Sequence, residues 1–319
     1  MAPQADPALP SDAWDDIYVG KFLGRREVQV TPEFVRRFTD GCQDDHPWYT
    51  AGSPFGGAVA PALVGSQEPW RFSGWYPAEM RGNLHAKQEW DLFGPVTVGS
   101  TYVSQAQVVE RYLWRGNRHV IVNEVTMSDV DGRTLARGRT HQSFLRGQPD
   151  GFVVDRQREQ KQERRFAPGE GEVIERIDGP TLVLTPQLCL AAADGMQNYH
   201  SDEEIAKAMG FPTVVVQGIF NANIISAVMT ERFGVGWWCG GKLRVSFVNV
   251  IWGGDSATAH LALREVVEES PRARAECEVW VDKPDGTVTA IGTASAVVDR
   301  EQAAPGGVRG FGDTPIETR

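Results

Sequence analysis

The sequence predicts an α+β protein made of two similar halves in tandem, each an antiparallel sheet wrapped around one central helix. Three observations support this prediction. The chain repeats itself internally, each half carries an apolar segment followed by strand-like patterns, and a charged segment separates the halves. A chain of 319 residues is also long enough for two domains that each bury a core.

The internal repeat emerges when the chain is aligned with itself. Residues 40–46 (DGCQDDH) return as residues 194–200 (DGMQNYH), with four of seven positions identical and an offset of 194 − 40 = 154. Two further matches lie in the same order at nearly the same spacing, so we infer a duplication. They pair Asp131-Gly132 with Asp285-Gly286 at an offset of 154 and, more loosely, 93–99 with 248–254 at 155.

Each half contains one apolar segment and then a series of alternating patterns. Residues 218–233 have the apolar spacing of a helix, and residues 58–70 occupy the corresponding place in the first half. Both Asp-Gly pairs predict hairpin turns. A sheet that curls around one helix is the hot-dog arrangement, so we expect a tandem (double) hot dog whose sheets pair edge to edge. The expected strands are 84–92, 102–109, 120–127 and 135–144, then 242–250, 256–266, 275–281 and 288–298.

The domain boundaries follow from composition. Residues 155–170 (DRQREQKQERRFAPGE) are highly charged and almost devoid of apolar side chains, which is typical of a solvated linker. The expected parts are a flexible N-terminus (1–12), an N-terminal hot-dog domain (13–150), a charged linker (151–172), a C-terminal hot-dog domain (173–300) and a flexible tail (301–319).

Composition also excludes several classes of function. The net charge is −10, with 42 acidic and 32 basic residues, which disfavours a nucleic-acid partner. No segment has the ~20 apolar residues of a membrane span, and no secretory signal is visible, so we expect a cytoplasmic protein without a membrane partner. The four cysteines are widely scattered, so we expect neither a disulfide framework nor a metal site.

Candidate catalytic residues lie in the second half. Asp194 and His200 flank a glycine-bearing turn and could converge on one cleft as an acid and a base. Gly218 begins the apolar helix, where bare backbone N–H groups could hold an enolate oxygen. We therefore predict that Asp194, His200 and Gly218 are catalytic. The neighbouring residues expected to bind substrate are Asn198, Gln217 and Asp202, although Asp202 before two glutamates is equally typical of a helix cap.

The second half also resembles a known family. His200-Ser201-Asp202, the later run A-x-x-x-G-F-P (206–212), Gln217-Gly218, the GGD at 253–255 and the PDG at 284–286 are similar to the MaoC-like (R)-specific enoyl-CoA hydratases. The resemblance implies a double hot dog, an acyl-CoA or acyl-carrier thioester as substrate, and no metal or separate cofactor. The family places its aspartate five residues before its histidine, where this chain has Gly195. Either a one-residue bulge brings Asp194 into the site, or Asp202 replaces it, or the carboxylate is absent.

The first half offers a second candidate site. The internal repeat selects Asp40 and His46, whereas the family motif aligns Asp44 with the catalytic aspartate and places Tyr49 where the histidine belongs. This half lacks a Gln-Gly pair before its apolar segment. We expect it to be catalytically degenerate and to shape the pocket for the acyl tail.

These features predict a hydro-lyase that adds or removes water at the 2,3 double bond of an enoyl thioester in fatty acid or polyketide metabolism. We also expect a homodimer of double hot dogs. Two alternatives remain open, an acyl-CoA thioesterase and a non-catalytic acyl-binding subunit.

Overall fold

A computed structural model describes residues 14–77, 83–114, 118–145, 166–192, 195–269 and 271–299. The strands of these residues form one ten-stranded sheet in the order β1-β3-β4-β5-β2-β7-β10-β9-β8-β6, and every neighbouring pair is antiparallel. The strands are β1 (Phe22–Gln29), β2 (Leu84–Leu92), β3 (Thr101–Trp114), β4 (Arg118–Asp129), β5 (Thr134–Leu145), β6 (Glu175–Val183), β7 (Lys242–Phe247), β8 (Ser256–Glu269), β9 (Arg272–Asp282) and β10 (Val288–Val298).

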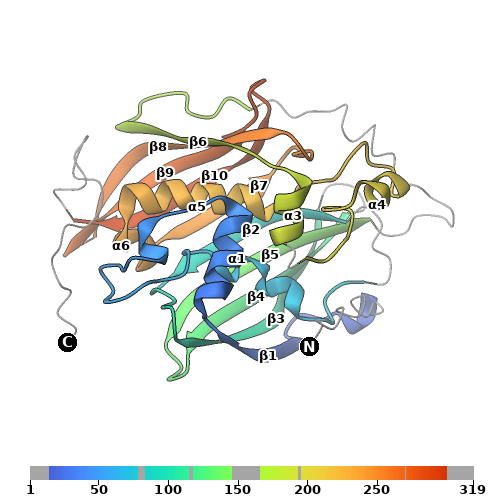
Figure 1. The fold of residues 1–319 in the computed structure, drawn as a ribbon, viewed down its shortest axis with the longest axis horizontal. Coiled ribbons are helices and arrows are strands. Elements are labelled where there is room, and N and C mark those ends of the chain that lie inside the picture. The colour runs from blue at the N-terminus through green and yellow to red at the C-terminus, as the bar shows by residue number, and fades with distance from the viewer. Residues whose placement is uncertain are drawn as a thin grey trace.

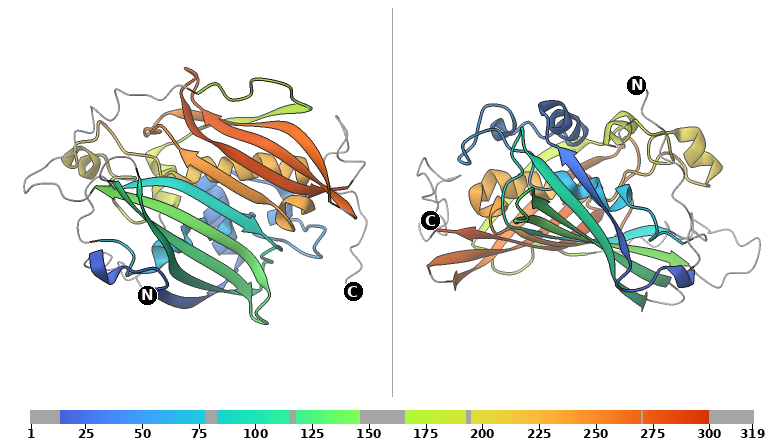
Figure 2. Two further views of the ribbon diagram at one scale, coloured as in Figure 1. Left: turned by 180° about the vertical axis from the view of Figure 1, so that it is seen from behind. Right: turned by 90° about the horizontal axis from the view of Figure 1, so that it is seen from below.

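The longer helices lie on one face of the curved sheet, as Figures 1 and 2 show. The α-helices are α1 (Pro32–Cys42), α3 (Pro186–Ala192), α4 (Glu203–Ala208), α5 (Ile219–Phe233) and α6 (Val235–Trp238), and the 3-10 helices are η1 (Trp14–Asp16), η2 (Pro47–Tyr49) and η3 (Val64–Arg71). None of the helices in the described residues is long and apolar enough to cross a bilayer.

Equivalent hydrogen bonds in the two halves confirm the duplication. The Thr31 hydroxyl accepts the Phe34 N–H at 3.1 Å at the start of α1, and 154 residues later the Thr185 hydroxyl accepts the Leu188 N–H at 3.3 Å beside α3. The strand order is also symmetric, since β1, β3, β4, β5 and β2 correspond in turn to β6, β8, β9, β10 and β7. The two sheets join edge to edge through β2 and β7, as the sequence predicts.

Helix α5 is the apolar helix predicted at residues 218–233. All of its residues except Ala227 and Glu231 are buried, because it packs on the concave side of the second half-sheet. The helix ends at Gly234, whose φ of 48° is easily adopted only by glycine and whose N–H bonds the Thr230 carbonyl.

The first half differs from the expected pattern of one central helix per half. Where an α-helix is predicted, at residues 58–70, the chain forms the 3-10 helix η3 (Val64–Arg71) with Pro69 inside it. Proline removes a backbone donor and breaks an α-helical ladder. Gly65 also lies so close to Met127 that an added Cβ would be 2.1 Å from its sulfur. An α-helix is wider than a 3-10 helix and would not fit against β4 at this position.

The predicted bounds of β2 and β10 agree with the structure. β7 ends earlier than predicted, and the other predicted strands are longer in the structure than in the prediction. The edge strands β1 and β6 were not predicted. Both have mostly exposed or partly exposed residues, so the apolar alternation that marks a strand is weak in them. The flexible ends and most of the predicted linker lie outside the described residues.

Candidate active site

His200 lies in a compact turn that precedes helix α4. The Asn198 side-chain oxygen accepts the backbone N–H of His200 at 2.8 Å, and the Asn198 backbone carbonyl accepts the N–H of Asp202 at 2.8 Å. Asp202 in turn accepts the N–H groups of Glu204 and Ile205 through one carboxylate oxygen. Asn198 and Asp202 thus hold the turn and cap α4, and Asp194 lies outside the described residues.

The hydrogen bond of the His200 ring fixes its tautomer. Its Nδ1 lies 2.6 Å from the Val215 carbonyl oxygen. A carbonyl can only accept, so Nδ1 carries the ring proton and Nε2 of the neutral ring has a free lone pair. Burial lowers the pKa of His200 to about 4, against the opposing effect of Val215. The ring is therefore a neutral base near pH 7.

The segment that bonds His200 leads directly into helix α5. Val215 is three residues before Gly218, which is the N-cap residue of α5 and has no side chain to cap it. The positive end of the helix dipole and the first backbone N–H groups meet there. Gln217 turns away from this point, because its amide nitrogen donates to the Cys189 carbonyl at 3.1 Å. The sequence-predicted residues His200 and Gly218 thus belong to one local structure.

A histidine of the first half completes the cluster, and the sequence patterns do not indicate it. The backbone of Gly218 is so close to His85 on β2 that an added Cβ would be 3.3 Å from His85 Nδ1 and 3.2 Å from the Phe247 ring. Positive charge on His141 and, less strongly, on His200 is a minor cause that lowers the pKa of His85. Burial is the main cause that lowers the pKa of His85 to about 3.

The second candidate site lies between α1 and α5. The Tyr49 hydroxyl donates to Asp44 at 2.8 Å, and burial raises the pKa of Asp44. His46 uses its ring differently from His200, because its Nδ1 accepts the Trp48 N–H at 3.3 Å and so lacks a proton. The proton of the neutral His46 ring is on Nε2, so this nitrogen is not a free base. Asp40 is exposed on α1, apart from the other three.

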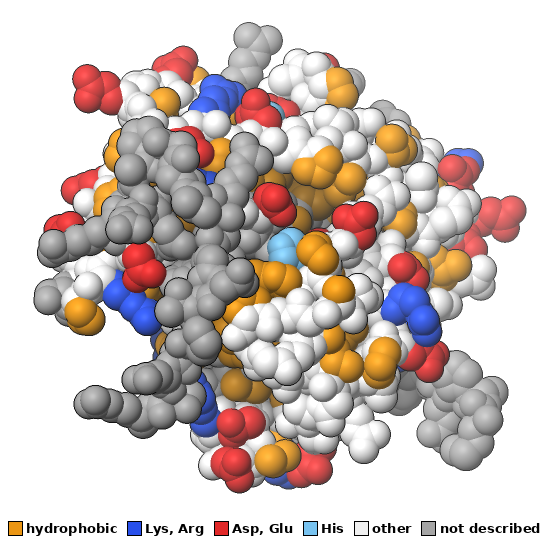
Figure 3. Space-filling model, turned by 60° about the vertical axis from the view of Figure 1, so that its left-hand side comes forward, with side chains coloured by type: hydrophobic (Ala, Val, Ile, Leu, Met, Phe, Trp, Pro, Cys, Tyr) orange, Lys and Arg blue, Asp and Glu red, His pale blue; other side chains and the backbone are white. Residues whose placement is uncertain are grey.

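Aromatic rings occupy the surroundings of His46. The Trp48 ring centroid is 5.3 Å from that of Trp238 and 6.1 Å from that of Phe55, and the Trp238 indole donates to the Ala60 carbonyl. Figure 3 shows one face of the molecule on which hydrophobic side chains reach the surface beside a histidine and several acidic residues. Aromatic side chains thus surround His46 in this cluster.

The fold is similar to those of solved MaoC-like dehydratases and of a protein with a double hot-dog fold. The structure is similar to a MaoC domain protein, a putative dehydratase from Chloroflexus aurantiacus (10% identity, TM-score 0.69, 93% of this chain and 99% of that one). It is also similar to a MaoC-like dehydratase from Phytophthora capsici (15% identity, TM-score 0.64, 91% and 99%). A Mycobacterium tuberculosis protein with a double hot-dog fold is similar at 11% identity (TM-score 0.59, 90% and 98%).

No family model matches the sequence, and no curated protein matches it significantly. At such low identities the similarity shows the fold. Within the described residues no group of three or more His, Cys, Asp or Glu side chains is placed to hold a metal ion. The candidate site is built around Gly218, with His85 beside it and His200 bonded to Val215 three residues before it.

Proposed function

We propose that the protein is a hydratase/dehydratase that acts on a 2-enoyl thioester in the second-half site. The observation that carries this proposal is the neutral His200 ring, whose Nδ1 is held by Val215, three residues before the N-cap of α5, so that the Nε2 lone pair is left as a base. Such a pairing of base and helix N-terminus suits addition of water β to a carbonyl, where an enolate develops.

The chemistry can be followed atom by atom. The thioester oxygen approaches the backbone N–H at Gly218, so the helix dipole draws electrons toward it. His200 Nε2 takes a proton from water as the water oxygen bonds to C3, and the electrons of the double bond move onto C2 and the thioester oxygen. The imidazolium then returns its proton to C2. Dehydration is the reverse sequence.

The carrier of the acyl group, either coenzyme A or an acyl-carrier protein, belongs to the substrate in this proposal. The first half supports the reaction by shaping the space for the acyl tail, and it takes no proton itself because His46 Nδ1 is engaged by Trp48. We place the protein in the cytoplasm, as a homodimer.

Replacing His200 tests the proposal. We expect His200→Ala to lower kcat/KM for hydration of an enoyl-CoA, followed by loss of enoyl-thioester absorbance, by about 10²- to 10⁴-fold. His46→Ala is the matched control, and we expect its activity to stay within about twofold of wild type because the His46 base position is blocked. Full activity in the His200 variant would exclude the assignment.

A second assay separates hydration from the alternatives. The same acyl-CoA panel is followed for release of free thiol and for the 3-hydroxyacyl product. Free thiol without hydroxyacyl product would identify a thioesterase, and tight binding without either product would identify an acyl-binding subunit.

A further inference from the structure

A row of buried polar residues crosses the first half of the sheet on the face that η3 covers. Asn123 on β4 lies opposite Thr140 on β5, which lies opposite Gln88 on β2, and none of the three has exposed surface. Gln142 follows two residues after Thr140 on the same face and is also buried. The Asn123 amide nitrogen donates to the Pro69 carbonyl of η3 at 3.2 Å, so these four residues, the polar row, point toward η3.

The equivalent positions of the second half are apolar. Their pairing matches that of the first half, because Cys277 lies opposite Ala294, which lies opposite Leu243. At the repeat offset of 154 or 155 residues, the correspondences are Asn123 with Cys277, Thr140 with Ala294, Gln88 with Leu243 and Gln142 with Ala296. Helix α5 packs on this face of the second half. The fold therefore does not require polar residues at these positions, and the polar row indicates a role other than packing.

Two oxygen atoms of the polar row have no hydrogen-bond partner within the described residues. They are Asn123 Oδ1 and Gln142 Oε1. The two amide nitrogens are already used, because Asn123 donates to Pro69 and Gln142 donates to the side-chain oxygen of Asn83. Both free atoms are therefore acceptors, and a buried acceptor without a donor is unfavourable. A ligand that supplies a hydrogen-bond donor to this row would offset that penalty.

The polar row leads to the proposed catalytic site. The β2–β5 pairing places His85 opposite Gln142, and the unpaired Ala86 is a bulge that turns His85 to the same face as the row. Gly218 lies beside His85, since an added Cβ would be 3.3 Å from its ring. Asn83, which Gln142 contacts, is partly exposed. An acyl chain whose thioester lies at Gly218 can therefore extend past His85 toward the row.

We propose that the first half selects acyl chains that carry a hydroxyl group in their distal part. The placement of the chain rests on the proposed hydratase function, which puts the thioester at the start of α5. Gln142 and Asn123 lie one and two strands from β2, on the order of 5 and 10 Å, so their oxygens meet the chain beyond the reacting carbons. The hydroxyl donates to one of these oxygens, whereas a plain alkyl chain leaves both without a donor.

A matched set of substrates tests the proposal. It comprises trans-2-decenoyl-CoA, its derivatives with one hydroxyl group at successive positions of the distal half of the chain, and crotonyl-CoA, which is too short to reach the row. We expect the wild-type kcat/KM for at least one hydroxylated ester to exceed that for the plain decenoyl ester by about tenfold or more. Equal values for all the decenoyl esters would overturn the selection and leave the hydratase function in place.

Two variants locate the selection in the polar row. Asn123→Leu and Gln142→Met remove the acceptors at similar volume, and we expect each to reduce the preference for the hydroxylated ester at least about threefold. Their kcat/KM for crotonyl-CoA should stay within about threefold of wild type. Gln107→Leu, which removes an amide from the opposite, exposed face of β3, is the control and should keep the preference. An unchanged preference in both row variants would overturn the assignment.

Binding of a saturated ester separates this inference from the hydratase function and needs no variant. Decanoyl-CoA and its hydroxylated counterpart cannot be hydrated, so the rise that each causes in the melting temperature of the wild type reports binding alone. A larger rise with the hydroxylated ester would support the selection even without turnover of any enoyl ester, a result that would overturn the hydratase function only. Equal rises together with no turnover would overturn both.

Discussion

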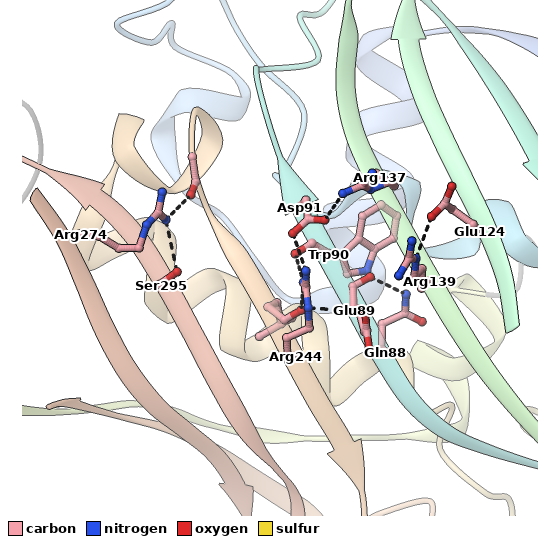
Figure 4. A network of polar contacts seen from close by, with 12 residues as sticks. Gln88, Glu89, Trp90, Asp91, Glu124, Arg137, Arg139, Arg244, Arg274 and Ser295 are labelled. Atoms are coloured by element: carbon pink, nitrogen blue, oxygen red, sulfur yellow. Dashed lines mark hydrogen bonds and ion pairs between the residues drawn. The ribbon is translucent and has the colours of Figure 1, made fainter. Parts of the chain in front are cut away.

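Glu89 and Arg244 lie opposite each other on β2 and β7 and are also equivalent residues of the two repeats, since 244 − 89 = 155. The flanking pairs agree, because exchange of the halves turns the pair Gln88–Val245 into Trp90–Leu243. Glu89 and Arg244 therefore mark the pseudo-twofold axis of the molecule. The duplicated position has diverged to opposite charges, and the guanidinium lies 3.5 Å from Glu89 and 2.6 Å from Asp91 (Figure 4).

We expect Arg244→Gln to lower the free energy of unfolding by about 1–2 kcal/mol. Arg244 is partly buried and also donates to the Trp90 carbonyl at 2.7 Å, so its loss leaves acceptors on β2 with fewer partners. Urea unfolding measures the change. Lys207→Gln, which removes an exposed ion pair with Glu203, should change stability by less than about 0.5 kcal/mol. Equal changes in the free energy of unfolding of the two variants would contradict the prediction that Arg244 stabilises the contact at the pseudo-twofold axis.

We expect Gly138→Ala to destabilise the fold by about 1–3 kcal/mol, because an added Cβ would lie 2.6 Å from the fully buried Trp90 ring. The double variant with Trp90→Phe should lose less stability than the sum of the two single changes, since the smaller ring relieves the clash. Thermal unfolding of the four proteins forms the cycle. Gly57→Ala, which meets open space, is the neutral control, and additivity in the cycle would contradict the steric explanation.

Most of the fold could be predicted from the sequence, because the second-half helix and the paired hairpins have strong apolar periodicity. The part that could not be predicted depends on local irregularities of the backbone. The bulge at Ala86 reverses the face on which His85 lies, so a strict alternation assigns this histidine to the wrong side. The 3-10 helix η3 likewise reflects Pro69 and the space left by Met127, and a window of apolar residues does not reveal that space.

The structure assigns different local contacts to the residues that the sequence singles out, for related reasons. His200 bonds Val215, in the short segment that leads to Gly218, as the order of the motif implies. Asn198 and Asp202 stabilise the turn through backbone contacts, and polar residues before a helix serve this purpose often. The sequence patterns also concern one half at a time. They therefore do not reveal His85, a first-half residue that lies beside Gly218 of the second half.

Acid should destabilise the protein through both site histidines. Their pKa values in the folded protein, about 4 for His200 and about 3 for His85, lie below the ordinary value of 6.5. Between the folded-state and unfolded-state pKa values, the unfolded chain binds more protons than the folded protein. The free energy of unfolding therefore rises with pH up to about 6.5 and falls as the solution is made more acidic. Each ring adds a slope of up to about 1.4 kcal/mol per pH unit.

Urea unfolding between pH 5 and 7 tests this prediction in a range where most carboxylates stay ionised. We expect His85→Asn and His200→Asn each to reduce the slope by up to about one bound proton, with the largest reduction near pH 5. An unchanged slope in both variants would mean that these rings titrate normally in the folded protein.

Gly218→Ala should separate activity from stability. The φ of −55° at Gly218 suits alanine, and the change should alter the free energy of unfolding by no more than about 1 kcal/mol. The new methyl group would, however, lie 3.3 Å from His85 Nδ1 and 3.2 Å from the Phe247 ring, on the approach to the first N–H groups of α5. We expect at least about a tenfold loss of hydration rate, consistent with removal of one oxyanion contact. Steady-state kinetics and urea unfolding on the same preparation measure both quantities, and wild-type turnover in this variant would show that the thioester oxygen binds elsewhere.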